Sequence, residues 1–174
     1  MLNIRRNTRL VTLSAVLTAA GVALIYLTAA MPTLQLAITA VAGMLAAIPL
    51  LLGGIKWCFL TYAATGLLAL VLGIDKEAAL FYLVLFGHWP VLKSIFEQRI
   101  RSAVLLWAVK LAVCNLLFLL LWLLVRLLSI DLGELGMPVW LFLIAGNVAF
   151  VLYDHCFTLL VRAFGARLMK YKMK

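Results

Sequence analysis

Charged side chains are scarce in this sequence. Only 12% of the 174 residues are charged, Asp and Glu together number 6, and 67% of the residues are hydrophobic. A soluble domain typically has about 25% charged and about 45–50% apolar residues. Because an ordinary core cannot hide so much apolar surface, we predict a membrane protein. Binding of nucleic acid is disfavoured despite the net charge of +9, since no soluble domain is present to carry it.

The sequence also lacks the short motifs of common enzyme classes. It contains no G-x-x-x-x-G-K-[ST] loop, no H-E-x-x-H and no G-x-S-x-G, so we expect no enzyme. Cys58, Cys114 and Cys156 lie in separate apolar segments without paired spacing, which favours reduced packing residues over a disulfide or metal site. No cofactor is expected. The remaining classes are a solute-binding membrane subunit, a scaffold or assembly factor, and a small secondary transporter.

Long apolar runs divide the chain into six segments. Crossing roughly 30 Å of hydrocarbon takes about 20 helical residues, and continuous apolar runs exclude the alternating pattern of a β-barrel. The first run is too long for the core of a signal peptide, so we read it as a helix. We predict an all-α polytopic membrane protein, a single domain over residues 1–174, with transmembrane helices at about 10–31, 33–53, 56–74, 78–89, 102–128 and 138–161.

The basic residues predict the orientation of this bundle. When segment ends are assigned alternately to the two sides, one side collects most Lys and Arg, and the other holds Lys76 with four acidic residues. Positively charged loops stay in the cytoplasm, so both termini are expected there, in a bacterial plasma membrane. Anionic lipid headgroups are the expected partner of the basic tail. The basic side comprises Arg5, Arg6, Arg9, Lys56, Lys93, Arg99, Arg101, Arg162, Arg167, Lys170, Lys172 and Lys174.

The fourth segment is short, because Gly87 and Pro90 interrupt it. One helix should end near Gly87 and another should begin near Pro90, where the missing N–H is tolerated. Residues 90–101 then form an amphipathic cytoplasmic segment, with Lys93 and Glu97 on its polar side. This segment either lies in the headgroup plane or docks a partner protein.

Polar residues within the last two helices require partners in lipid. Lys110 and Asp154 are expected at the same depth, roughly 12 Å from the cytoplasmic boundary, and we predict that they form an ion pair. Asn147 shares a face of its helix with Asp154, whereas Asn115 and His155 point elsewhere. These groups either lock the two helices together or line a path for substrate or protons.

Small residues form a stripe on the first helix. Ala15, Ala19 and Ala23 recur every four residues, a spacing that lets another helix approach closely. The stripe is suited to packing within this bundle or to contact with a partner protein.

Several motifs resemble one transporter family. Six helices, the A-x-x-x-A stripe and the absence of an ATPase motif are similar to the S component of energy-coupling factor (ECF) transporters, the membrane subunit that binds substrate. The finer resemblance is to S-component-like proteins without an assigned substrate. It covers "GIKW" (54–57), F-G-x-x-P-x-x-K (86–93), "KLAVCN" (110–115) and "YD" (153–154).

This resemblance implies a subunit that captures a small molecule, such as a vitamin or related micronutrient. Its partners would be a transmembrane T component, contacted through Ala15, Ala19 and Ala23, and ATPases that supply energy. The alternatives are a scaffold without ligand and a proton-linked secondary transporter. The candidate substrate contacts are Gln35, Tyr82, Trp122, Arg126, Trp140 and Asn147.

Overall fold

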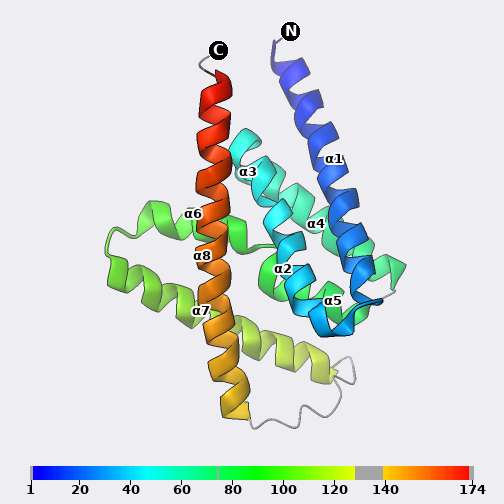
Figure 1. Cartoon of the computed structure of the whole chain (residues 1–174), viewed down its shortest axis with the longest axis vertical. Helices are drawn as coiled ribbons and strands as arrows, with labels where there is room; N and C mark the ends of the chain where they lie inside the picture. The colour runs from blue at the N-terminus through cyan, green and yellow to red at the C-terminus, as the bar shows by residue number, and fades with distance from the viewer. Residues whose placement is uncertain (1, 74, 128–138, 173–174) are drawn as a thin grey trace. The chain divides into compact units, whose positions relative to one another are not determined.

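Helices account for every regular element in the structure. The computed structural model describes residues 2–73, 75–127 and 139–172, and within these ranges each element is an α-, 3-10 or π-helix. The predicted all-α class is therefore confirmed (Figure 1). Six helical stretches are long and apolar enough to cross a membrane, which supports a multi-pass membrane protein. They are Asn7–Thr28, Pro32–Gly53, Ile55–Leu72, Lys76–Arg99, Ala103–Leu124 and Leu143–Phe164.

The chain divides into two compact units. The first unit, Met1–Leu132, contains every element up to and including α7 (Ala103–Leu127). The second unit, Gly133–Lys174, contains the long helix α8 (Val139–Lys172).

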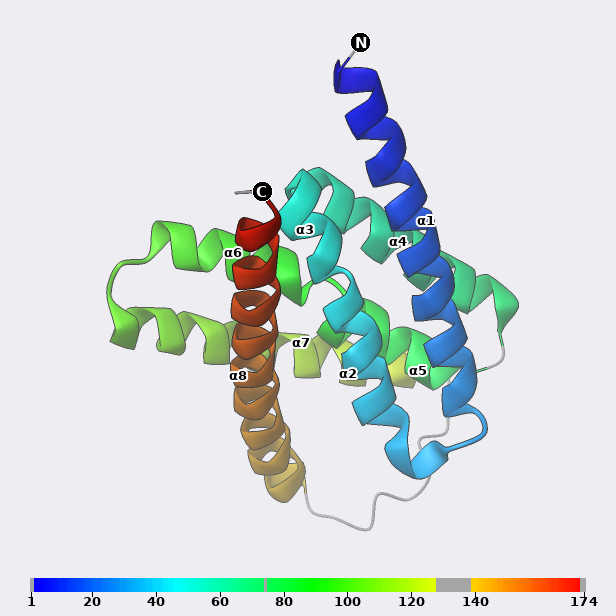
Figure 2. The same cartoon turned by 45° about the horizontal axis from the view of Figure 1, so that its top comes forward.

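The first unit is built on two neighbouring helices, α1 (Leu2–Thr28) and α4 (Ile55–Leu72), which pack against each other (Figures 1 and 2). A Cβ atom on Gly21 would lie 2.9 Å from Thr65 Cγ2, so the absence of a side chain at Gly21 permits this close approach. Small residues at such contacts are typical of helix pairs in membranes. Buried positions recur every one to four residues along α1 and form one face of the helix. They are Leu10, Ser14, Leu17, Thr18, Gly21, Ile25 and Thr28.

A proline divides the second span into two helices. After the 3-10 turn η1 (Pro32–Leu34), α2 (Gln35–Leu45) ends just before α3 (Ala47–Gly53) begins. Pro49 cannot donate to the carbonyl of Leu45 four residues earlier, and its ring crowds that carbonyl, so the continuous helix breaks there. Gly54, with φ of 88°, then turns the chain into α4.

The fourth span contains a π-helix. α5 (Lys76–Phe81) passes into η2 (Tyr82–Phe86), where Gly87 N donates to Tyr82 O, five residues earlier, at 2.7 Å. The break expected between Gly87 and Pro90 follows, and α6 (Trp89–Arg99) begins there. By length and composition, the candidate span includes α6 and runs to Arg99, well beyond the expected end at 89.

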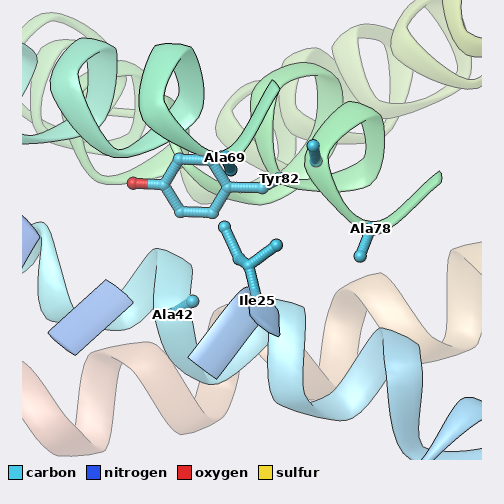
Figure 3. Packing of buried hydrophobic residues seen from close by; sticks show 6 residues of the cluster. Ile25, Ala42, Ala69, Ala78 and Tyr82 are labelled. Atoms are coloured by element: carbon cyan, nitrogen blue, oxygen red, sulfur yellow. The ribbon is translucent and has the colours of Figure 1, made fainter. Parts of the chain in front are cut away.

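Alanines bring the helices of this unit together around one aromatic ring. Tyr82 packs with Ile25 of α1, Ala42 of α2 and Ala69 of α4, and Figure 3 shows the Ile25 side chain beside the Tyr82 ring. At Gly43, α2 approaches η2 so closely that a Cβ atom would lie 2.8 Å from the carbonyl oxygen of Phe86. Methyl-sized side chains thus fix the spacing of four elements.

Candidate functional site

Three charged side chains join α6 to α7. Lys93 Nζ and Lys110 Nζ lie 3.2 and 3.0 Å from the same oxygen, Glu97 Oε1. The two lysine side chains are 5% and 3% exposed, whereas the Glu97 side chain is 44% exposed. The Lys110 ammonium also lies 5.3 Å from the centre of the Trp107 ring, within the range of a cation–π contact. One carboxylate thus links two buried ammonium groups on successive helices.

These contacts bear on two predictions, the position of Lys93 on its helix and the partner of Lys110. Lys93 and Glu97 were predicted on the same polar side of their helix and do form a pair, but Lys93 is buried with Trp89 and Pro90. Glu97, one turn later, supplies the negative charge that makes this burial tolerable. The predicted pair of Lys110 with Asp154 joins the two units and stays a prediction. Sequence reasoning missed both ion pairs of Glu97: the spacing of four was a usable signal for the pair with Lys93, whereas the pair with Lys110 spans thirteen residues and two helices.

A second polar cluster surrounds Asp75, between α4 and α5. Thr28 Oγ1 lies 2.6 Å from both Asp75 Oδ2 and Ile25 O and shares its one proton between them. Asp75 Oδ1 accepts from Ala78 N at 2.9 Å as the N-cap of α5. Gln35 Nε2 donates to both oxygens, at 3.0 and 3.1 Å. One carboxylate therefore ties together the end of α1 and the starts of α2 and α5.

Two of the candidate substrate contacts are engaged within this unit. Gln35 is the residue whose amide bonds to Asp75. Tyr82 is 1% exposed and lies in the buried cluster of Figure 3, so in this structure its side chain serves packing. Neither was predicted in these roles, because the contacts come from segments distant in the sequence.

The π-helix gathers polar aromatic side chains. Tyr62 Oη donates to Leu83 O at 2.9 Å, and His88 Nδ1 lies 3.2 Å from the same oxygen, which it reaches as a donor in the Nδ1-protonated tautomer. The Tyr62 ring centre is 6.0 Å from those of both Tyr82 and His88. A single main-chain carbonyl thereby holds two side chains against η2.

The other candidate contacts lie on α7 and α8. The Arg126 guanidinium stacks over the Trp122 ring at 4.7 Å, one turn apart on α7. Trp140 is in α8, but its side chain lies outside the described residues. Asn147 Nδ2 donates to Leu143 O at 2.8 Å within the same helix.

The remaining members of the predicted polar network are also placed by their helices. Asn115 Nδ2 donates to Leu111 O at 2.8 Å, within α7. Thr158 Oγ1 donates to Asp154 O at 2.8 Å, within α8, and His155 is exposed on that helix. These bonds are local to single helices and assign no function.

The alanine stripe lies on the exposed side of α1. Ala15, Ala19 and Ala23 are exposed, while Ser14 and Thr18 beside them are buried. The first helix thus has one face that packs in its unit and a smooth face that remains accessible.

Neither known proteins nor groups of metal-binding side chains indicate a function for this chain. No family model, curated protein or solved structure matches the chain. Within the described ranges, no group of three or more His, Cys, Asp or Glu residues is placed to hold a metal ion.

Proposed function

We propose that this chain is a substrate-binding, S-component-like subunit of an ATP-driven uptake transporter in a bacterial plasma membrane. Both termini are cytoplasmic in this proposal, as the distribution of Lys and Arg favours. The substrate is a small molecule such as a vitamin or related micronutrient. A T component and ATPases supply the energy, because the sequence has no nucleotide-binding loop of its own.

The exposed alanine stripe is the observation that carries this proposal. Small residues allow the closest contact between helices in lipid. The buried face of α1 already uses such residues, Gly21 among them, to pack on α4, and a second stripe of small residues, Ala15 and Ala19, is left exposed. This arrangement supports an intermolecular contact through the stripe.

Arg126 and Trp122 are the strongest of the proposed substrate contacts in the first unit. Both are exposed on α7, and their stacked geometry presents a planar cation on an aromatic ring. Such a surface suits a ligand that has an anionic group and an apolar body. Trp140 and Asn147 of α8 complete the proposed set, but no contact between them and α7 is implied.

The test is a pull-down of the tagged full chain from native membranes, followed by mass spectrometry of proteins and small molecules. The Ala15→Trp/Ala19→Trp variant should lose the T component and the ATPases because its stripe is no longer smooth. Leu67→Trp/Val71→Trp is the matched control, since these residues have the same spacing and are exposed on α4. It should recover the same partners as the parent chain.

The opposite result separates the alternatives. A parent preparation with no T component and no ATPase would contradict the proposal. Flux driven by a pH gradient in vesicles containing only this chain would then support the secondary transporter. Absence of flux and of bound small molecules would support the scaffold.

A further inference from the structure

The short connection between α6 and α7 carries two exposed arginines. Arg99 is the last residue of α6, and Arg101 follows it after Ile100, whose backbone is extended with φ of −104° and ψ of 113°. Ile100 is half-buried, whereas the arginines on either side of it are exposed. Both guanidinium groups are therefore presented at the surface, at the tip of the α6–α7 hairpin (89–127).

No described residue neutralises these two charges. Within the described ranges, the side chains of Arg99 and Arg101 form no ion pair and no hydrogen bond. Glu97 is the single acidic residue of α6 and α7, and its Oε1 is already paired with Lys93 and Lys110. The first turn of α7 contains no acidic residue, so the partial positive charge of that helix end is not compensated either. The tip of the hairpin therefore favours an anion.

The tip lies where two candidate membrane spans meet. One span ends at Arg99 and the next begins at Ala103. The connection between them, residues 100–102, is therefore placed at the boundary of the hydrocarbon layer, where the phosphates of phospholipids lie. Lys and Arg at such a boundary attract anionic headgroups. Lipid phosphate is thus the anion that reaches this tip at the highest local concentration.

Exposed apolar side chains follow directly on α7. Val104 is 82% exposed, Leu105 is 55% exposed and Trp107 is 38% exposed. A soluble anion would leave these side chains in water, whereas the acyl chains of a phospholipid would cover them. Tryptophan is also enriched where a membrane helix reaches the interface. Cations followed by an apolar surface fit an amphiphile with an anionic head.

We propose that the α6–α7 hairpin binds an anionic phospholipid. Arg99 and Arg101 contact its phosphate, and Val104 and Leu105 pack against its acyl chains. Arginine suits this role because a guanidinium group can donate two parallel hydrogen bonds to phosphate oxygens. The inference is independent of the proposed transport function, and neither the T component nor a substrate enters its test.

The test measures lipid binding by native mass spectrometry of the full chain in a neutral detergent. Phosphatidylglycerol is titrated in, and phosphatidylcholine with the same acyl chains is the control lipid, because its choline group neutralises the phosphate. Phosphatidylglycerol should bind at least about tenfold more tightly than phosphatidylcholine.

Two double variants assign the binding to the arginines. Arg99→Gln/Arg101→Gln should lower the affinity for phosphatidylglycerol at least about tenfold, because each basic residue near an anionic surface contributes roughly fivefold. Arg9→Gln/Lys56→Gln is the matched control, since it removes the same charge from exposed positions of α1 and α4. It should bind phosphatidylglycerol as the parent does. The basic tail is identical in all these chains, so its own attraction for lipid cancels in the comparison.

A second pair of variants tests the contact with the acyl chains. Val104→Ser/Leu105→Ser should weaken the binding of phosphatidylglycerol. Val71→Ser/Leu72→Ser makes the same changes on α4, at positions that are also 82% and 55% exposed, and should not weaken it. Glycerol 3-phosphate has the anionic group but no acyl chains, so it should not displace the lipid at equal concentration.

Several results would overturn the proposal. Equal affinity for the two lipids is one, and unchanged affinity for phosphatidylglycerol in Arg99→Gln/Arg101→Gln is another. An acidic segment of a partner protein would then be the occupant that fits the two arginines. A loss of the same size in Arg9→Gln/Lys56→Gln would show attraction by net charge without a site. Displacement of the lipid by glycerol 3-phosphate would identify a soluble anion as the ligand instead.

Discussion

The carboxylates of Asp75 and Glu97, both in the first unit, are stabilised by different kinds of partner. Three neutral donors from three elements bond to Asp75, and within the described ranges it forms no ion pair. Glu97 is held by two buried lysines, which share one of its oxygens. The difference indicates distinct roles. The neutral donors come from α1, α2 and α5 and join three elements around one carboxylate, whereas the ion pairs of Glu97 join two helices.

The elements around each cluster are consistent with this division. Asp75 lies beside a pocket and at the ends of helices that pack through glycine and alanine, so packing already holds the helices together. Lys93 and Lys110 come from α6 and α7, which are consecutive and joined by a short turn. There the ion pairs themselves supply a large part of the attachment.

The largest effect is expected when the Glu97 cluster is broken. Glu97→Gln keeps the shape of the side chain but removes the charge shared by Lys93 and Lys110. We expect the free energy of unfolding to fall by about 3 kcal/mol, the low end of the range for a broken buried pair, because Glu97 is partly exposed. SDS titration of the chain in mixed micelles measures this change.

Two further variants test the cause. Glu77→Gln makes the same change at a partly buried position in the first turn of α5 and should alter the unfolding free energy by less than about 0.5 kcal/mol. Adding Lys93→Met and Lys110→Met to Glu97→Gln should restore part of the loss, because the two buried ammonium groups that Glu97 neutralises are then replaced by apolar side chains. If Glu97→Gln is as stable as the parent, the cluster is not a joint between α6 and α7.

A smaller loss is expected in the Asp75 cluster, where each donor is one of three. Thr28→Val preserves volume and removes a hydroxyl that lies 2.6 Å from Asp75 Oδ2. We expect a loss of about 1.5 kcal/mol, typical of one hydrogen bond to a charged group. Thr12→Val, at an exposed position of the same helix, is the control. A loss as large as that of Glu97→Gln would remove the contrast between the clusters.

The sequence predicted the helices better than the contacts between them. The apolar runs were sufficient to identify six spans, and Gly87 and Pro90 to place one break, because length and proline chemistry act locally; the fourth span, however, extends to Arg99 and not to the expected end at 89. The π-helix was not foreseen, since nothing in residues 82–86 distinguishes them from an α-helix. Its extra residue is instead accommodated by the packing of Tyr62 and Gly43 against it.

The candidate site was harder to predict for a related reason. Lys110 was recognised as a charge that needs a partner, and its expected depth in the membrane indicated Asp154. Depth alone does not determine in which direction a side chain points around its helix, so it could not indicate Glu97. Asp75 was counted only as one of the four acidic residues on the side of Lys76, because its partners Thr28 and Gln35 are 47 and 40 residues away in sequence. Polar partners distant in the sequence become visible only after the helices have been packed.

The smallest effect, with the opposite sign, is expected at Ser14. Its hydroxyl is buried in the first unit, and no described residue forms a hydrogen bond with it, in contrast to both carboxylates. Because an unpaired buried hydroxyl costs free energy, Ser14→Ala should stabilise the chain by up to about 1 kcal/mol in the same SDS titration. Ser94→Ala, which removes the acceptor of an exposed bond from Gln98, should leave stability within about 0.5 kcal/mol of the parent. A loss of stability in Ser14→Ala would instead mean that the hydroxyl is satisfied, and that the buried face of α1 contains a third polar contact comparable to the two clusters.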